Sequence, residues 1–432
     1  MKSFATSREA PWRENRNERI ERPVSAALGL DGTTRQSFWG FGACANELPM
    51  AAIQQLPAAR QQSLFRDMYH PQAEGLRFSV CRIPIGASDY AQSWYSLNDT
   101  EGDYDMAHFS LERDQKLLLP YLRAVKAQNP QTLFFASPWS PPAWMKHPQA
   151  YNYGKLVWAE RNLRAYALYL LKFCQAYERE GIPIAQLHVQ NEPISSQKFP
   201  SCCWTGEELA QFIGRYLGPV FRDAGQKTQL WLGTLNGPET DDRFLTTRFD
   251  QYANLVLHTP EAAQFISGVS YQWAGKQAVQ ATRDAYPRLP LMQSENECGD
   301  GRNTWEFACY IFEMVHHYLR NGVQYYVYWN PVLPAGGEST WGWRQNSLYT
   351  VENGRLKANH EYYVMRHYAQ FIRPGAVLRG LAGDLCANAI CAENPDGSLA
   401  LVLRNPFAFP LEVSFRDSVL YLKPDTIYSY MF

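Results

Sequence analysis

The sequence lacks features that mark several large classes of protein. No apolar run reaches the roughly 18 residues that a membrane-spanning helix needs. Positive charge is not in excess, since 41 Lys and Arg residues stand against 42 Asp and Glu residues. Such a balance leaves little charge to neutralise the phosphates of a nucleic acid. We therefore expect neither a membrane span nor a nucleic-acid partner.

The N-terminal stretch and the cysteines exclude further classes. Residues 1–23 contain no apolar core of a signal peptide, and their Arg residues alternate with Glu, so we expect a cytoplasmic protein. The nine cysteines show no CxxC spacing, which argues against a structural zinc site and against a disulfide framework. Signatures of a Ser-His-Asp triad and of a phosphate-binding loop are also missing. We expect no metal and no cofactor.

What the chain does have is length and aromatic side chains. Its 432 residues exceed what one hydrophobic core usually covers, which predicts one large barrel or two to three domains. Aromatic residues make up 14% of the chain and include 13 Trp. Their flat apolar faces and polar edges suit either a core or a pocket for sugars. Composition alone leaves both readings open.

The order of apolar segments indicates the fold. Short runs typical of strands alternate with longer helical stretches, such as 159–180 and 304–320. Eight strands are predicted, at 38–42, 76–84, 132–137, 185–191, 228–234, 268–273, 290–295 and 323–330. Eight strands with interposed helices predict an α/β fold, the (β/α)8 TIM barrel.

The two ends of the chain read differently from its middle. After the barrel, short alternating strands are joined by turns such as NPDG at 394–397. We expect residues 36–371 to form the barrel and 372–432 a small side-linked β-sandwich, to which strands within 1–35 contribute. The first 20 or so residues are expected to be disordered or to reach a neighbouring subunit.

Two carboxylates follow predicted barrel strands directly. Glu192 follows LHVQN at the end of the fourth strand, and Glu295 follows LMQS at the end of the seventh. The carboxyl ends of barrel strands hold the active site, so both side chains can face one cleft. Paired carboxylates suit glycosidic bond cleavage, whereas a lone Glu at a strand end more often caps a helix or pairs with Arg. Glu297 is a rival to Glu295, because residues two apart on a strand share a face.

Five motifs support the same interpretation. They are GFGACANE at 40–47, RIPIGASDY at 82–90, SPWSPPAWMK at 137–146, VQNEP at 189–193 and QSENECGDG at 293–301. In this order they resemble glycoside hydrolase family 30, the glucosylceramidase-like retaining glycosidases. The resemblance implies a (β/α)8 barrel with a side β domain built from both chain ends.

The resemblance also implies roles for the two carboxylates. Glu192 is expected to be the general acid/base and Glu295 the nucleophile, since the family's seventh-strand motif places the nucleophile directly after a Ser or Thr. Glu295 must then be ionised while Glu192 holds a proton, so negative charge nearby is expected to raise the pKa of Glu192. We expect a carboxyl separation of about 5–5.5 Å and retention of the β-anomer.

Three further polar residues are expected in the pocket. Asn191 is expected to hydrogen-bond the sugar 2-hydroxyl, the alternative being a helix cap. Arg82 resembles the second-strand Arg that keeps the nucleophile ionised. Glu47 stands where relatives often carry an Asp that binds sugar hydroxyls.

Aromatic residues at strand ends are expected to bind the sugar ring. Trp139, Trp273 and Trp329 end the third, sixth and eighth strands, where their faces can stack on a pyranose, although each taken alone suits a core equally well. Beside Trp273, Gln272 and Ala274 depart from the His, Trp and Tyr run of the glucosylceramidase branch, which argues against a ceramide substrate. Gln272 would contact substrate through a neutral amide in place of an imidazole.

The sequence therefore predicts a retaining β-glycosidase that acts on β-glucosides or short β-gluco-oligosaccharides, in an exo manner. The alternatives are a β-xylosidase, β-fucosidase or β-1,6-glucanase of the same family, or a non-catalytic carbohydrate-binding protein on a degenerate barrel. The segment WGWRQNSLY at 341–349 follows the eighth strand and reads equally as an aromatic subsite wall or as a surface loop.

Overall fold

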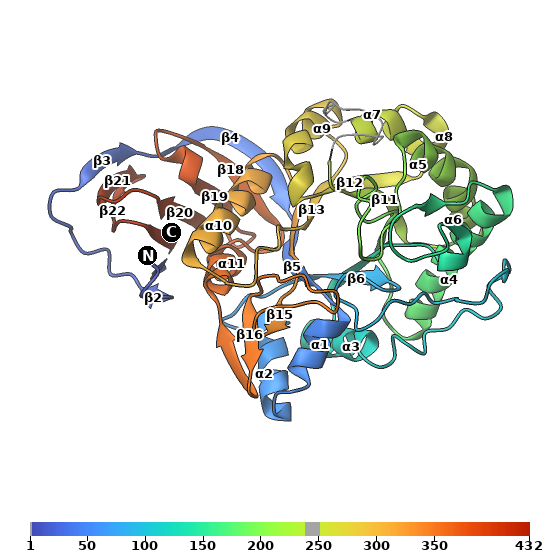
Figure 1. Ribbon diagram of the computed structural model, residues 1–432. Coiled ribbons are helices and arrows are strands. Elements are labelled where there is room, and N and C mark those ends of the chain that lie inside the picture. Colours follow the sequence, from blue (N-terminus) through green and yellow to red (C-terminus); the bar gives the residue numbers. More distant parts are fainter. Residues whose placement is uncertain (1, 238–250) are drawn as a thin grey trace.

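A closed barrel and a side β domain make up the chain, in a computed structural model that describes residues 2–237 and 251–432 (Figure 1). The barrel strands are β5 (Gly40–Cys44), β6 (Val80–Ile85), β7 (Leu133–Pro138), β10 (Gln186–His188), β11 (Gln229–Leu235), β12 (Ile266–Gln272), β13 (Leu291–Glu295) and β14 (Tyr325–Tyr328). They pair in parallel in chain order, and β14 closes onto β5. Each matches one of the eight predicted strands, so the (β/α)8 fold is confirmed.

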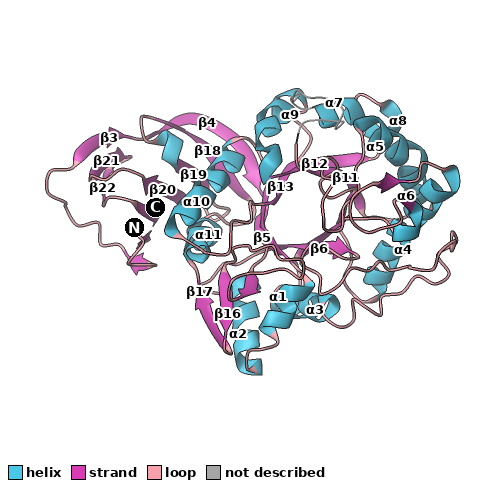
Figure 2. Cartoon of the chain, viewed as in Figure 1, coloured by secondary structure: helices cyan, strands magenta, loops and turns pink. Residues whose placement is uncertain are grey.

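Helices surround the barrel (Figure 2). They are α1 (Glu47–Ile53), α2 (Ala58–Tyr69), α3 (Leu118–Gln128), α4 (Glu160–Arg179), α5 (Gly206–Phe212), α6 (Gly218–Asp223), α7 (Gln251–Leu257), α8 (Pro260–Ala263), α9 (Val279–Ala285), α10 (Trp305–Arg320) and α11 (His360–Phe371). The predicted helices 159–180 and 304–320 are α4 and α10. Helix α10 begins at Thr304, whose hydroxyl accepts a hydrogen bond from the Phe307 N–H.

Both chain ends build the side β domain. Its larger sheet contains β1 (Lys2–Thr6), β2 (Arg13–Glu14), β4 (Gly29–Phe38), β18 (Ala376–Ala382), β19 (Ala389–Glu393), β20 (Leu399–Asn405) and β23 (Thr426–Met431), and its smaller sheet contains β3 (Val24–Ala27), β21 (Leu411–Phe415) and β22 (Ser418–Leu422). Strand β1 pairs with β23, β3 with β21 and β4 with β18, so the two termini lie close together (Figure 1). The first residues therefore form a paired strand, which corrects the expectation of disorder.

The loops at the carboxyl end of the barrel contain two small sheets of their own. Strands β8 (Lys146–His147) and β9 (Lys155–Leu156) follow β7, while β15 (Val332–Pro334), β16 (Tyr349–Glu352) and β17 (Arg355–Ala358) follow β14. Within the described ranges no helix is both long and apolar enough to cross a bilayer.

The amino-terminal half of the barrel interior is a hydrophobic layer. Its cluster of buried side chains consists of Val80, Phe135, Trp231, Met292, Tyr325 and Val327. Gly268 makes room for Trp231, because a Cβ at residue 268 would lie 2.6 Å from the indole ring. This packed layer closes one end of the barrel and leaves the other end for polar side chains.

Candidate active site

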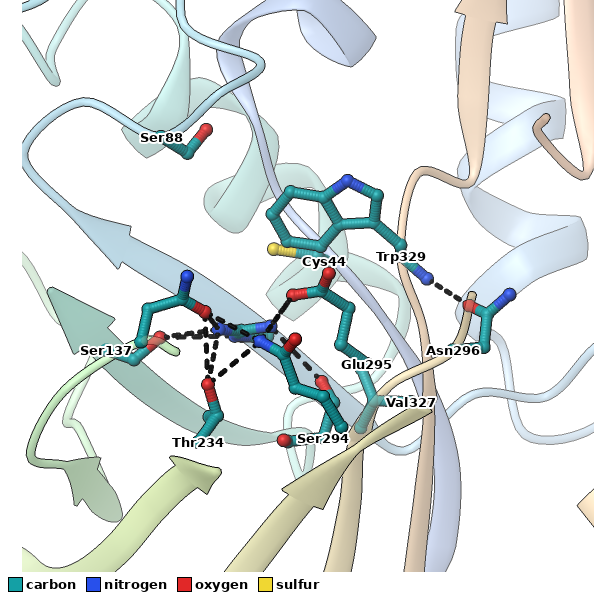
Figure 3. Close-up of polar contacts among 12 residues, drawn as sticks. Cys44, Ser88, Ser137, Thr234, Ser294, Glu295, Asn296, Val327 and Trp329 are labelled. Carbon is teal, nitrogen blue, oxygen red and sulfur yellow. Dashed lines mark hydrogen bonds and ion pairs between the residues drawn. The ribbon is translucent and has the colours of Figure 1, made fainter. Parts of the chain in front are cut away.

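A buried ion pair lies at the centre of the carboxyl end of the barrel. Arg82 on β6 has no solvent exposure, and its Nη1 donates to Oε2 of Glu295, the last residue of β13. The other guanidinium nitrogens donate to the hydroxyl of Ser137 at 2.9 Å, to Oδ1 of Asn191 at 2.6 Å and to Oγ1 of Thr234 at 3.2 Å. Figure 3 shows this network converging on Glu295 from several strands. Arg82 is thus fixed on every side.

Gln272, the last residue of β12, joins the same network. Its Nε2 lies 3.0 Å from Oε2 of Glu295, 2.8 Å from Oδ1 of Asn191 and 3.0 Å from Oγ1 of Thr234. Oε2 of Glu295 therefore receives hydrogen bonds from both Arg82 and Gln272. No described residue hydrogen-bonds Oε1, so that oxygen is the one left to react.

Glu192 comes from the turn that follows β10. Its φ of 48° lies in the left-handed region, which a non-glycine residue adopts only when its surroundings hold it there. The turn is held because the Glu192 N–H donates to the Thr234 carbonyl at 3.0 Å and its own carbonyl accepts from the Ser195 N–H at 2.9 Å. The strained turn brings the Glu192 carboxyl to the wall of the same pocket as Glu295.

The electrostatics of the two carboxyls differ in their partners. Burial raises the pKa of Glu192. Burial also raises the pKa of Glu295, and the charges of Glu192 and Asp89 act in the same direction, while Arg82 opposes them. Because two donors hold Oε2 of Glu295, the ionised form is solvated there, and a proton shared within the pair belongs on Glu192.

The pocket above these groups has a volume of about 710 Å³, within the range of small-molecule sites. Its wall is lined by Asp89, Trp139, Glu192, Ser195, Gln197, Phe199, Asn236, Trp273, Ala274, Glu295, Cys298, Trp343 and Gln345. Polar and aromatic side chains thus share the wall, as the recognition of a sugar requires.

The three tryptophans expected to bind sugar have different places. Trp139 and Trp273 line the pocket, whereas Trp329 does not. Trp329 is 1% exposed and stacks on Trp139 with ring centroids 5.4 Å apart. The Arg82 guanidinium lies 4.6 Å from the Trp139 ring and 5.3 Å from the Trp329 ring. Trp329 therefore covers the ion pair by cation–π contact rather than forming pocket wall.

Two acids are placed differently from the sequence-based expectation. Glu47 begins α1, and its carboxylate receives Nε and Nη2 of Arg113 at 2.7 and 2.9 Å and the Gln92 N–H at 2.7 Å. It therefore anchors loops outside the pocket. Asp89, which sequence reasoning missed, lines the pocket, and burial and the charge of Glu192 raise its pKa to about 7. The available signal was its position in RIPIGASDY, directly after the second strand.

Glu297, the rival to Glu295, does not line the pocket. Its carboxylate accepts a hydrogen bond from the hydroxyl of Tyr310 on α10. Among residues 2–237 and 251–432, no group of three or more His, Cys, Asp or Glu side chains is placed to hold a metal ion.

The sequence has clear relatives. Putative glucosylceramidase 2 of Caenorhabditis elegans is 28% identical over 91% of this chain and 81% of its own length. Lysosomal acid glucosylceramidase of Mus musculus is 26% identical over 88% and 78%, respectively. Endo-1,6-beta-D-glucanase BGN16.3 of Trichoderma harzianum is 26% identical over 92% and 84%.

Solved structures share the whole architecture. SrfJ from Salmonella typhimurium and the endo-β1,6-glucanase BT3312 each match with a TM-score of 0.85 and 22% identity, over 100% of this chain and 99% of theirs. The profile of the glycosyl hydrolase family 30 TIM-barrel domain matches residues 38–372, which include the barrel and both pocket glutamates. The chain therefore belongs to glycosyl hydrolase family 30 and is a glycoside hydrolase.

Proposed function

We propose that this enzyme hydrolyses β-glucosides or short β-gluco-oligosaccharides from the chain end, with Glu295 as nucleophile and Glu192 as acid/base. The observation that carries the proposal is the unequal treatment of the two carboxyls. Arg82 and Gln272 both donate to one oxygen of Glu295, which favours its ionised form. Glu192 has no ion pair among the described residues, and burial raises its pKa, which favours the protonated acid.

The reaction proceeds in two balanced steps. Oε1 of Glu295 attacks the anomeric carbon as the bond to the leaving oxygen breaks, and Glu192 gives its proton to that oxygen. Water then attacks the glycosyl ester, Glu192 takes a proton from it, and the β-anomer is released with Glu295 restored. Formation of the ester removes the charge of Glu295, so Glu192 becomes the stronger acid when it has to act as the base.

Asn191 is suited to bind the sugar 2-hydroxyl. Its Oδ1 already accepts hydrogen bonds from Arg82, Thr234 and Gln272, which fixes the orientation of the amide. The Nδ2 group is then left as a fixed donor beside the nucleophile. A donor at this place strengthens its bond to the 2-hydroxyl in the oxocarbenium-like transition state.

Glucose is the glycone that the named relatives favour, since they are glucosylceramidases and endo-1,6-β-glucanases. Exo action is supported by the size of the pocket, because about 710 Å³ suits one or two sugar rings better than a long chain. The second candidate is an endo-β-1,6-glucanase, favoured by the similarity to such enzymes along nearly the full chain.

The proposal is tested by trapping the intermediate. Incubation with 2-deoxy-2-fluoro-β-glucosyl fluoride should release fluoride and leave the fluoroglucosyl group on Glu295, which peptide mass spectrometry locates. Label on Glu297, or the α-anomer appearing first in proton NMR with an unmodified substrate, would overturn the assignment. A panel of β-linked gluco-oligosaccharides then separates the two candidates, because exo action releases glucose first and endo action releases longer products.

A further inference from the structure

An aromatic cluster forms part of the pocket rim without any role in the reaction described above. Phe199, Trp341 and Trp343 pack together, with centroid distances of 5.1 Å between Phe199 and Trp341 and 5.2 Å between the two tryptophans. Phe199 and Trp343 line the pocket that contains the two glutamates. Trp343 nevertheless remains 40% exposed, so a large apolar face is presented to solvent at the pocket.

The cluster is held in place by the loops beneath it. The indole N–H of Trp341 donates to the Asp89 carbonyl at 2.8 Å, and the hydroxyl of Tyr90 donates to the Gly337 carbonyl at 2.7 Å. The ammonium of Lys198 lies 4.9 Å from the Trp341 ring. The exposed face of Trp343 is therefore carried by a preorganised loop, which lowers the entropy lost when a ligand packs on it.

The cluster lies on the acid/base side of the pocket. The chain leaving Glu192 supplies three further lining residues in sequence, Ser195, Gln197 and Phe199. Glu192 protonates the leaving oxygen, so the group attached to that oxygen must lie near the wall formed by residues 192–199. The last residue of this wall, Phe199, contacts both tryptophans.

We propose that Phe199 and Trp343 form a binding platform for a sugar ring on the leaving-group side of the cleaved bond. The inference rests on the proposed function and deepens it by naming the leaving group as a pyranose of a β-gluco-oligosaccharide. An aromatic face takes the C–H surface of a pyranose, and the side chains of Ser195 and Gln197 supply polar partners for its hydroxyls. A lipid leaving group would require a continuous apolar wall, which this mixture of side chains does not provide.

The first test compares two substrates of Trp343→Ala. β-Glucosyl fluoride has a leaving group too small to reach the platform, whereas the β-linked gluco-disaccharide that the wild type cleaves fastest extends across it. We expect the kcat/KM for the disaccharide to fall by about tenfold more than that for the fluoride, and Trp343→Phe to recover most of the difference. Equal losses on both substrates would mean that Trp343 only shapes the pocket, and would overturn the platform.

A matched control removes an equally exposed tryptophan elsewhere. Trp39 is 41% exposed and packs on Tyr325 just before β5, at the opposite end of the barrel. Trp39→Ala should not change the ratio of the two kcat/KM values. Thermal melting of both variants separates a loss of folded protein from a loss of binding.

A second test uses the trapped enzyme and does not depend on the chemical step that forms it. The fluoroglucosyl ester on Glu295 is released when a sugar acceptor attacks it from the leaving-group side, and the acceptor hydroxyl gives its proton to Glu192. Added glucose or β-linked gluco-disaccharide should speed reactivation of wild type several-fold more than that of Trp343→Ala. No acceleration of wild type by either sugar would overturn the platform. A wild type that hydrolyses neither β-glucosyl fluoride nor any gluco-disaccharide would instead refute the proposed function.

Discussion

Two layers of side chains fill the barrel on the same strands, and they differ completely in chemistry. On β6 Val80 belongs to the apolar layer and Arg82, two residues later, to the ion-pair network. On β7 Phe135 and Ser137 are divided in the same way. The lower layer is stabilised by burial of apolar surface, whereas every polar group of the upper layer must find a partner after losing water. The comparison teaches that catalysis here occupies core positions, not surface ones.

The comparison is broken most severely by removing the reacting oxygen of the upper layer. Glu295→Gln keeps an oxygen that Arg82 can bond but removes the nucleophile, so kcat should fall by at least about 10⁴-fold with little change in melting temperature. Steady-state rates on a gluco-disaccharide check this. Glu297→Gln is the matched control, since its carboxylate bonds Tyr310 outside the pocket. An inactive Glu297→Gln beside an active Glu295→Gln would reverse the roles.

A matched pair of substitutions on β6 separates the two layers directly. Arg82→Met leaves Glu295 buried without its cation, so we expect a loss of about 3–5 kcal/mol of stability, and kcat lower by on the order of 10²–10³-fold as Glu295 becomes protonated. Val80→Ala should cost about 1–3 kcal/mol through a cavity, with the kcat of the remaining folded enzyme nearly unchanged. Denaturant unfolding and active-site titration measure the two effects. Comparable losses of kcat in both variants would show that the layers are not separable.

Gln272 tests how the upper layer positions the nucleophile. Gln272→Ala removes one of the two donors to Oε2 of Glu295, so kcat should fall by about 10–100-fold while KM changes little. Gln272→His restores a donor but adds an imidazole, which should introduce a new ionisation into the pH profile of kcat/KM between about pH 5 and 8. A profile identical to wild type would indicate that residue 272 does not contact the reacting carboxylate.

Local patterns predicted the barrel strands well because each repeats a short apolar run between helices. They failed for β1, since its five residues pair with β23 at the other end of the chain, and no local pattern records that partner. The ion pair of Arg82 and Glu295 could be predicted, because both residues end strands that point into one barrel.

The two acids of the loops show where sequence reasoning ends. Glu47 and Asp89 each follow a strand and carry the same charge. Only the path of the loops decides that Glu47 meets Arg113, 66 residues away, while Asp89 turns into the pocket. The layering itself is also absent from the two-residue period, which assigns Val80 and Arg82 to one face without saying where along the strand the chemistry changes.

The mildest test concerns a buried carboxyl outside the barrel interior. Glu361 on α11 is fully buried, accepts hydrogen bonds from the Tyr328 hydroxyl and from Nδ2 of Asn346 at 2.7 Å, and has no cation partner among the described residues. Burial raises its pKa from 4.5 to about 8. Glu295 differs because Arg82 compensates its charge. Glu361 instead remains protonated at neutral pH and links α11 to the loop that follows β14.

The sign of the pH effect follows from that shift. Between pH 4.5 and 8 the folded protein binds the Glu361 proton and the unfolded chain does not, so this group makes stability fall as pH rises through the window. Glu361→Gln is neutral throughout, and its melting temperature should therefore lose several degrees less than that of wild type between pH 5 and 8. Parallel melting curves at both pH values would show that Glu361 is ionised in the folded state. A buried acid would then be tolerated here without a cation, and the contrast with Glu295 would disappear.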